Sequence, residues 1–390
     1  MSAGWNAEVA QLFRALRIDS PHELTLAGRK FTVPAGAVPA AGVVPGGAVP
    51  GAVPMGGAVP AGAVRAGIPP RPAGAAPPAP IPPVPGPAAT VPPAPLPALL
   101  GSVLYYHVYS RPFTGRLAEA VPAAREDRAP DAGLAARLAA ANGSRDRWEQ
   151  GWRITQVLPG GQVLAQRGGA SRTLWPGQFL SQDGPGAPPR PGGQIRLFYP
   201  KESTSLQPGF YYVFGETPEE ESHGFGLVRA YWNVTAAGAP GLVRLLSARL
   251  NRFHVPFRFK CSVVPSEYER TDVAVVYLSK RFFPIFADLL GDIHPELRAH
   301  LGDEVPLFAK RLLAGVGIAE DPGNGESFGQ HRCRLLAETL WNCFLSGNQS
   351  LSARRSELGR LLGASGVDER QLHLNAGSLD VYELPAGAAA

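Results

Sequence analysis

Apolar and polar positions follow different periods in different parts of the chain. Val9, Leu12, Phe13 and Leu16 recur at the spacing of one helical face, which predicts a short amphipathic helix in an N-terminal arm, residues 1–32. Its apolar stripe has to be buried on the main domain or on a partner. After this arm the periodic pattern disappears until about residue 99.

The segment 33–98 holds 20 of the 41 prolines and only two charged residues, Arg65 and Arg71. Valine and alanine supply most of its apolar surface, so burial cannot offset the entropy lost on ordering this segment. The composition predicts a disordered low-complexity insertion, and a proline-rich ligand segment is the less favoured alternative.

From residue 99 the pattern becomes that of a folded domain. Residues 99–109 predict a buried helix, and the Ala/Arg-rich stretch 116–145 predicts helical pieces. Residues 152–158 and 162–167 alternate around Pro-Gly-Gly and predict a hairpin. Further short strands are expected at 195–199, 210–214, 227–234 and 256–264, with a helix around 242–250 between the last two.

The stretch 273–278 is almost entirely apolar, as expected for a central strand that is buried on both sides. Strands followed by helices, rather than strict alternation, predict an α+β fold with a mixed or antiparallel sheet and C-terminal helices. This main domain is expected over 99–383, with a flexible tail over 384–390. The C-terminal helices are expected at 281–290, 296–301, 305–314, 332–344 and 358–362.

Composition excludes several classes of protein. The formal net charge is +5, but no lysine-rich stripe or basic run accompanies it, so nucleic-acid binding is not indicated. Cys261, Cys333 and Cys343 form no CxxC pair and are expected to be reduced thiols. The first residues lack a basic region followed by an apolar run, and Pro and Gly interrupt the apolar residues of 33–98. We therefore expect a cytoplasmic protein.

Two predicted strands carry the candidate chemistry. Each has an apolar face and an opposite polar face, which presents Arg229, Tyr231 and Asn233 in one strand and Arg258, Lys260 and Ser262 in the other. If these strands are neighbours, the polar faces form a pocket for a phosphate or a carboxylate. Alternation alone favours a simpler interpretation, in which both faces point into solvent.

The residues around these strands favour the pocket. Tyr268, Arg270 and Asp272 alternate at the start of the buried strand, where a solvated loop would not need an Arg-x-Asp pair. Glu267 and Glu269 alternate with these residues, point to the opposite side and are expected to be exposed. Two more polar residues are expected at strand ends or turns, where functional side chains are common: Lys201 and His223.

A glycine-rich stretch, 315–332, leads into the long helix. We expect the helix to begin at Glu326 or Ser327 and to place backbone N–H groups and Arg332 where an anion could dock. An ordinary capped helix start is the competing interpretation. The glycines match neither the dinucleotide fingerprint nor a P-loop. No G-x-S-x-G, no HExxH and no dense carboxylate pair occurs, so hydrolase and metalloenzyme functions are not indicated.

Five motifs in this order resemble the type A Hop effector family of bacterial type III secretion, whose cytoplasmic relatives occur in biosynthetic clusters for lanthipeptides and thioamitides. The resemblance covers roughly 99–383, with 1–32 as a detached piece of the same domain. The motifs are Gly-Phe-Tyr-Tyr-Val-Phe-Gly-Glu at 209–216, Val-Arg-Ala-Tyr-Trp-Asn at 228–233, Val-Pro-Phe-Arg-Phe-Lys at 255–260, Tyr-Glu-Arg-Thr-Asp at 268–272 and Ala-Glu-Asp-Pro-Gly-Asn-Gly-Glu-Ser-Phe-Gly at 319–329.

The resemblance to the biosynthetic relatives implies a phosphoserine/phosphothreonine lyase. Such an enzyme eliminates phosphate from a phosphorylated precursor peptide and leaves dehydroalanine or dehydrobutyrine. The implied partners are this precursor peptide, with its leader, and a kinase-like protein of the same pathway, without nucleic acid or membrane. The reaction requires no metal and no organic cofactor.

Elimination needs a base for the Cα–H, cations for the leaving phosphate and a proton donor. We assign the base to Lys260, because Arg258 and a strand interior would lower its pKa. The expected general acid is His223, with Tyr231 or Tyr277 behind it. The expected phosphate and substrate contacts are Arg229, Arg270, Lys201, Arg258, Asn233 and Arg332.

Two other functions fit the same residues. A non-catalytic module could bind a phosphopeptide or support a kinase, and it would tolerate arginine in place of Lys260, whereas a base would not. A host-directed type III effector would instead dock onto a partner in the host cell.

Overall fold

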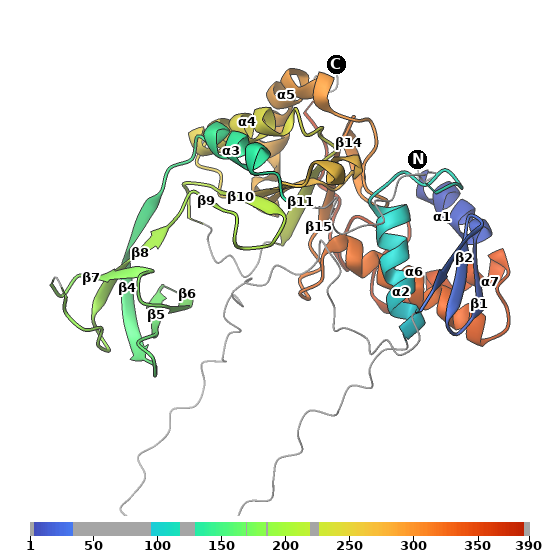
Figure 1. Cartoon of the computed structure of the whole chain (residues 1–390), viewed down its shortest axis with the longest axis horizontal. Helices are drawn as coiled ribbons and strands as arrows, with labels where there is room; N and C mark the ends of the chain where they lie inside the picture. Colours follow the sequence, from blue (N-terminus) through green and yellow to red (C-terminus); the bar gives the residue numbers. More distant parts are fainter. Residues whose placement is uncertain are drawn as a thin grey trace, which may run out of the picture.

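A computed structural model describes the chain at residues 4–33, 95–117, 129–168, 170–184, 186–218 and 226–385. Within these ranges the chain forms seven α-helices and three antiparallel sheets (Figure 1). The predicted α+β class is therefore confirmed. Most of the expected insertion, 34–94, and the tail from 386 onward lie outside the described residues.

The largest sheet has seven strands in the order β14-β15-β11-β13-β12-β10-β9. All neighbouring strands run antiparallel. The central strand, β13, is buried from Ala274 to Leu278, as its sequence predicted. The seven strands are β9 (Glu202–Ser203), β10 (Phe210–Phe214), β11 (Leu227–Trp232), β12 (Arg258–Ser262), β13 (Ala274–Ser279), β14 (Lys310–Leu313) and β15 (Val316–Glu320).

One face of the sheet is covered by α3 (Ala132–Ala141), α4 (Ala239–Arg252) and α5 (Phe283–Leu297), which Figure 1 shows together on one side. Every second strand residue points into this layer, where Trp232 and Phe259 join one large apolar core. Because side chains alternate along a strand, the residues between them face the opposite side.

The opposite face is covered by α2 (Pro95–Leu104), the π-helical turn η1 (Tyr105–Tyr109) and α6 (Phe328–Leu345). Tyr231, Val275 and Tyr277 of the sheet join a second core on this side. This core continues to α1 (Gly4–Ala15) and α7 (Leu351–Ala364). π-helical turns are rare and occur frequently at functional sites, so η1 marks this face as a place for chemistry.

The N-terminal arm forms α1 and a small sheet of β1 (Leu16–Ser20), β2 (Glu23–Leu26) and β3 (Arg29–Thr32). Its apolar residues are buried in the second core, where Arg354 of α7 donates to the carbonyl oxygens of Phe13 and Leu16. Helical spacing predicted α1, but the helix ends at Ala15, and Leu16 begins a strand that the spacing did not reveal.

The third sheet, which we call the β lobe, has the order β6-β5-β4-β8-β7 and a small core around Trp152 and Ile195. Figure 1 shows it to one side of the main sheet and its helices. The predicted hairpin is confirmed, with Val157 paired to Val163. Its strands are β4 (Arg147–Val157), β5 (Val163–Arg167), β6 (Ala170–Leu174), β7 (Phe179–Ser181) and β8 (Gln194–Tyr199).

The structure corrects three expected boundaries. The prediction of a helix at 305–314 is wrong, because Lys310–Leu313 is the strand β14 and pairs with β15. A tight turn at Gly315, which has a φ of 71°, connects the two strands. The separate helix at 296–301 is the end of α5 and a 3₁₀ turn, Arg298–His300. The helix α2 begins at Pro95, inside the expected insertion. Two other 3₁₀ turns lie at Pro265–Glu269 and Lys280–Phe282.

Candidate active site

The register of the main sheet brings the two polar strand faces together, although not as neighbours. The pocket was predicted on the condition that β11 and β12 are neighbours, but β13 lies between them and pairs with both. A strand inserted between two others keeps their matching positions on one face, so the polar residues still point the same way. Two cross-strand rows result: Arg229–Tyr277–Arg258 and Tyr231–Val275–Lys260.

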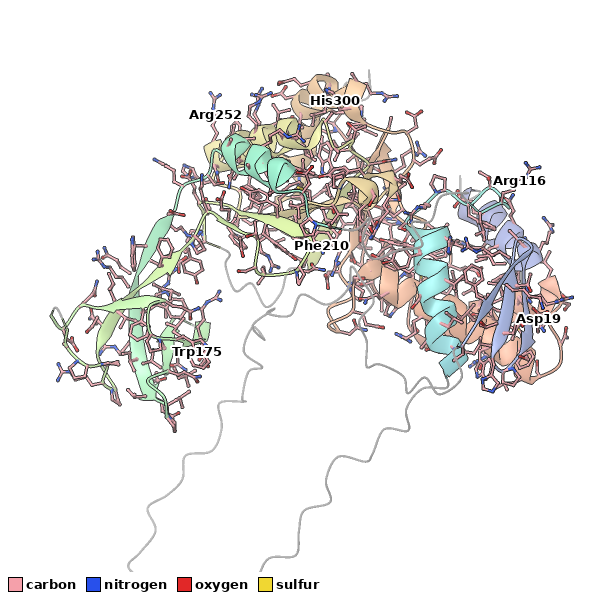
Figure 2. The ribbon with its side chains drawn as sticks, in the orientation of Figure 1. Asp19, Arg116, Trp175, Phe210, Arg252 and His300 are labelled. Carbon is pink, nitrogen blue, oxygen red and sulfur yellow. The ribbon has the colours of Figure 1, made fainter. Side chains whose placement is uncertain are left out.

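These rows form the floor of a pocket beneath η1 and the start of α6. Lys260 is only 4% exposed and Tyr231 only 3%, so the interpretation in which these faces point into solvent is wrong. The enclosed space is about 10 Å³, room for about one water molecule, so a phosphoryl group enters only if side chains move. The lining residues are Tyr105, Tyr109, Phe210, Arg229, Tyr231, Lys260, Arg270, Asp272, Val275, Tyr277, Ser327 and Gly329. Figure 2 labels Phe210, which begins β10.

Lys260 is the buried amine of this pocket. Its Nζ donates to Gln207 Oε1 at 3.1 Å, lies 4.5 Å from the centre of the Phe210 ring and also bonds to Tyr277. Among the described residues, no carboxylate lies at ion-pair distance from this amine. Burial lowers the pKa of Lys260; Tyr277 and the charge of Asp272 oppose this effect, and the charge of Arg229 strengthens it. Lys260 is therefore easier to deprotonate than an exposed lysine, as a general base requires.

Arg229 lies in the next row, and its charge acts on that amine. Its Nε and Nη2 lie 2.7 and 2.5 Å from Asp321 Oδ2, in the loop after β15. Its guanidinium also lies over the Tyr277 ring, at 5.2 Å. A guanidinium has five N–H donors, so this fixed arginine keeps donors for an anion in the pocket.

Arg270 lines the pocket but is already neutralised. Its Nε and Nη2 donate to the two oxygens of Asp272, each at 2.9 Å, and its Nη1 donates to Glu267 at 2.8 Å. Burial opposes ionisation of Asp272, but Arg270 lowers the pKa of its carboxyl. The expectation that Glu267 is exposed is wrong, because its side chain is only 16% exposed and is bound to Arg270. Arg270 therefore holds Asp272 in place rather than offering a free charge.

Tyrosine hydroxyls form the remaining polar wall. Tyr105 donates to Asp272 Oδ2 at 2.7 Å, and Tyr109 is hydrogen-bonded to Tyr231. Burial raises the pKa of Tyr109 and Tyr231, so both keep their protons at neutral pH. Sequence analysis did not assign Tyr105 and Tyr109 to the site, because a π-helical turn has no local signal that distinguishes it from the end of a helix.

The start of α6 closes the pocket on its other side. Ser327 caps the helix and exchanges hydrogen bonds with Gln330, which confirms the expected helix start. The next two backbone N–H groups, of Phe328 and Gly329, have no acceptor within the helix and suit an anion. A Cβ on Gly329 would lie 2.3 Å from Tyr109, so only glycine lets η1 approach the helix so closely.

Several predicted site residues do not line the pocket. Arg258 shares a row with Tyr277 and lies 5.6 Å over its ring. Lys201 lies 4.0 Å from Glu202 next to β9. His223 lies outside the described residues. The last two are used elsewhere: Asn233 donates to the Glu304 carbonyl at 3.0 Å, and Arg332 donates to the carbonyls of Leu372 and Leu374 at 2.9 and 2.8 Å.

The described ranges contain no group of three or more His, Cys, Asp or Glu side chains that could hold a metal ion. In the same ranges, no helix is long and apolar enough to cross a membrane.

The fold and the site define an α+β protein with a buried pocket of lysine, arginine and tyrosine side chains. Residues 201–374 match the model of the HopA1 effector protein family. This segment contains the whole seven-stranded sheet and α6, so the part of the chain that carries most of the pocket is similar to that family.

Two solved structures from Pseudomonas syringae are similar to the chain. The effector protein from pathovar tomato strain DC3000 has 15% identity and a TM-score of 0.35, with 66% of this chain and 84% of that chain covered. The effector protein from pathovar syringae strain 61 has 12% identity and a TM-score of 0.36, with 70% and 89% covered. No curated protein matches the chain.

Proposed function

We propose that the pocket eliminates phosphate from phosphoserine or phosphothreonine residues of a peptide. The protein would then be a carbon–oxygen lyase that leaves dehydroalanine or dehydrobutyrine in its product. One observation carries the proposal: Lys260 is a buried amine with a lowered pKa that faces the pocket without a carboxylate partner among the described residues.

Lys260 Nζ takes the proton from Cα of the phosphorylated residue. The electron pair of that C–H bond forms the Cα–Cβ double bond, the Cβ–O bond breaks, and the phosphate leaves with the electrons of that bond. Negative charge develops on the neighbouring carbonyl oxygen as the proton is removed. The hydroxyls of Tyr231 and Tyr277 lie on the pocket floor, where they can donate to this oxygen or to the leaving oxygen.

In this proposal, Arg229 and the backbone N–H groups at the start of α6 bind the phosphate. The guanidinium of Arg229 is oriented by Asp321, and the N–H groups of Phe328 and Gly329 are free of helical acceptors. Arg270 contributes through Asp272 and Tyr105, which it holds against η1. The donors for the phosphate come from β11 and from the start of α6, and they meet on one face of the sheet, which suits an anion with several equivalent oxygens.

We place the substrate and partners in the biosynthetic branch of the family. The peptide would be a phosphorylated precursor of a lanthipeptide or thioamitide, phosphorylated by a kinase-like protein of the same pathway. A lyase of this kind works without metal or organic cofactor, because Lys260, Arg229 and the tyrosines supply base, anion binding and proton donors.

The second candidate is an effector that binds a partner without chemistry. The match of 201–374 to the HopA1 effector protein family favours it, because that family is named for effector proteins. In this case the same cations would hold a phosphorylated or carboxylate group of the partner and release it unchanged.

A pair of Lys260 variants separates the two candidates. Mass spectrometry of a phosphoserine peptide incubated with the protein should detect loss of phosphoric acid, and Lys260→Ala and Lys260→Arg should both abolish it. Isothermal titration of the same peptide into Lys260→Arg should still show binding, because arginine keeps the charge. Full turnover by Lys260→Arg would remove the assignment of Lys260 as the base, and binding without turnover by the wild type would favour the effector.

A further inference from the structure

The β lobe carries most of the net charge of the molecule. Residues 147–199 contain six arginines, no lysine and two acidic residues, a formal charge of +4 in a chain whose total is +5. The lobe has its own apolar core and lies outside the segment 201–374 that matches the effector family. Its charge is therefore a local feature of this lobe, separate from the pocket.

Both acidic residues of the lobe are already paired. Glu149 lies 3.1 Å from Arg147 and 3.3 Å from Arg167, and Asp183 lies 3.1 Å from Arg190. Within the described part of the chain, the other three arginines have no carboxylate partner. These are Arg153, Arg172 and Arg196.

The face of the lobe that points away from its core is apolar as well as basic. Trp148 pairs with Phe198 across β4 and β8, and Leu180 pairs with Arg196 across β7 and β8. Trp148 is 44% exposed, Phe198 36% and Leu180 45%, although side chains of this size are usually buried. Arg196 lies over the Trp148 ring at 5.1 Å.

Arg153 extends the same face along β4, opposite Gln194. Since Trp152 and Ile154 point into the core, Arg153 between them points outward. The described residues of the lobe place no carboxylate on this face, because Glu149 is buried on the core side and Asp183 follows β7 in a loop. Figure 2 marks the lobe by Trp175, itself 57% exposed.

We propose that this outer face binds an acidic, extended segment of the peptide substrate, at a distance from the phosphorylated residue. Arg153 and Arg196, which have no carboxylate partner among the described residues, pair with carboxylates of the segment. Trp148, Phe198 and Leu180 cover the apolar side chains that lie between those carboxylates. Two arginines are too few for the backbone of a nucleic acid, which is bound through a run of basic residues. The choice of the substrate as occupant rests on the proposed lyase function.

The test uses the full chain and a fluorescein-labelled peptide of repeated Glu-Leu-Glu-Gly units, followed by fluorescence anisotropy. The wild type should bind it, and the double variant Arg153→Glu/Arg196→Glu should weaken binding at least about tenfold. Trp148→Ser should weaken it in the same direction. Two control variants, Arg355→Glu on α7 and Phe253→Ser after α4, change an exposed arginine and an exposed aromatic elsewhere and should leave binding within about twofold.

Equal binding by wild type and double variant would overturn the proposal, as would equal affinity for a peptide with Lys in place of Glu. Displacement of the acidic peptide by single-stranded DNA, with tighter binding of the DNA, would assign the face to nucleic acid instead. The lyase function is tested separately with a short phosphopeptide that lacks an acidic extension. The double variant should turn this peptide over like the wild type, and Lys260→Ala should still bind the acidic peptide.

Discussion

Gly329→Ala tests whether η1 and the start of α6 pack as closely as the pocket requires. The added Cβ would lie 2.3 Å from Tyr109 Cε1 and 2.7 Å from Tyr105 Cε2. Carbon atoms rest at about 3.5 to 4.0 Å, so the Tyr109 ring has to move by roughly 1 Å or more. Overpacking of a tight interior typically costs about 1 to 3 kcal/mol, and we expect this loss in the free energy of unfolding.

Gly101→Ala provides the matched control. Gly101 lies inside α2, and apart from its chain neighbours and the backbone of its own helix, no described atom lies within 4 Å of the position of its added Cβ. Removing a glycine from a helix interior gains about 0.5 to 1 kcal/mol, so the two substitutions should change stability in opposite directions. Urea unfolding followed by tryptophan fluorescence measures both.

The pocket should respond to Gly329→Ala as well. Displacing Tyr109 pulls on its hydrogen bond to Tyr231, so binding and turnover of a phosphopeptide should fall while Gly101→Ala leaves them unchanged. If Gly329→Ala proved as stable and as active as the wild type, the close packing of η1 against α6 would be refuted.

The other predictions concern ionisable groups. Lys260→Met should raise the free energy of unfolding at neutral pH, because it removes a buried amine whose burial lowers its pKa. The unfolded wild-type chain holds a proton that the folded protein releases. The free energy of unfolding of the wild type should therefore rise with pH up to the ordinary lysine pKa of 10.5. Glu320→Ala should cost about 3 kcal/mol, since Lys280 and Tyr382 lose their acceptor. Hydrogen bonds from these groups lower the pKa of Glu320 against its burial, so this stabilisation is present above pH 4.5 and lost as the pH falls through the lowered value. Asp321→Ala should weaken phosphopeptide binding about tenfold by releasing Arg229.

Urea titrations at several pH values check the first two of these predictions, and calorimetric titration checks the third. Parallel pH profiles of stability for the wild type and Lys260→Met would contradict the lowered pKa. Glu369→Ala, at an exposed position, is the control for Glu320→Ala. If both variants lost the same free energy of unfolding, Glu320 would not stabilise the fold as an acceptor for Lys280 and Tyr382. An unchanged affinity in Asp321→Ala would mean that Arg229 does not depend on this carboxylate.

Local patterns were enough to find several residues of the site. Period-two alternation placed Arg229 and Lys260 on polar strand faces, and the local sequence placed the start of α6 at Glu326 or Ser327, because both signals lie within a few neighbouring residues. The order of the strands in the sheet could not be predicted in this way. That β13 lies between β11 and β12 depends on pairing between distant segments, which no local pattern encodes.

The lack of local signals for contacts between distant segments also explains why sequence analysis missed the hydrogen-bond partners of several site residues. Tyr105 reaches Asp272 across 167 residues of sequence, and Arg229 reaches Asp321 across 92. Residues 305–314 looked helical because their apolar spacing fits a helix as well as a strand, and only the pairing of β14 with β15 decides between the two. Arg332 was expected near an anion, but the carbonyls of the C-terminal segment occupy its donors.

The measurement that tests the central claim most directly is mass spectrometry of a phosphoserine peptide incubated with the wild type and with Lys260→Ala. The account predicts loss of phosphoric acid with the wild type, formation of dehydroalanine that a thiol can trap, and neither product with Lys260→Ala. Intact phosphopeptide after incubation with the wild type, in the presence of a leader-bearing substrate and the kinase-like partner, would contradict it.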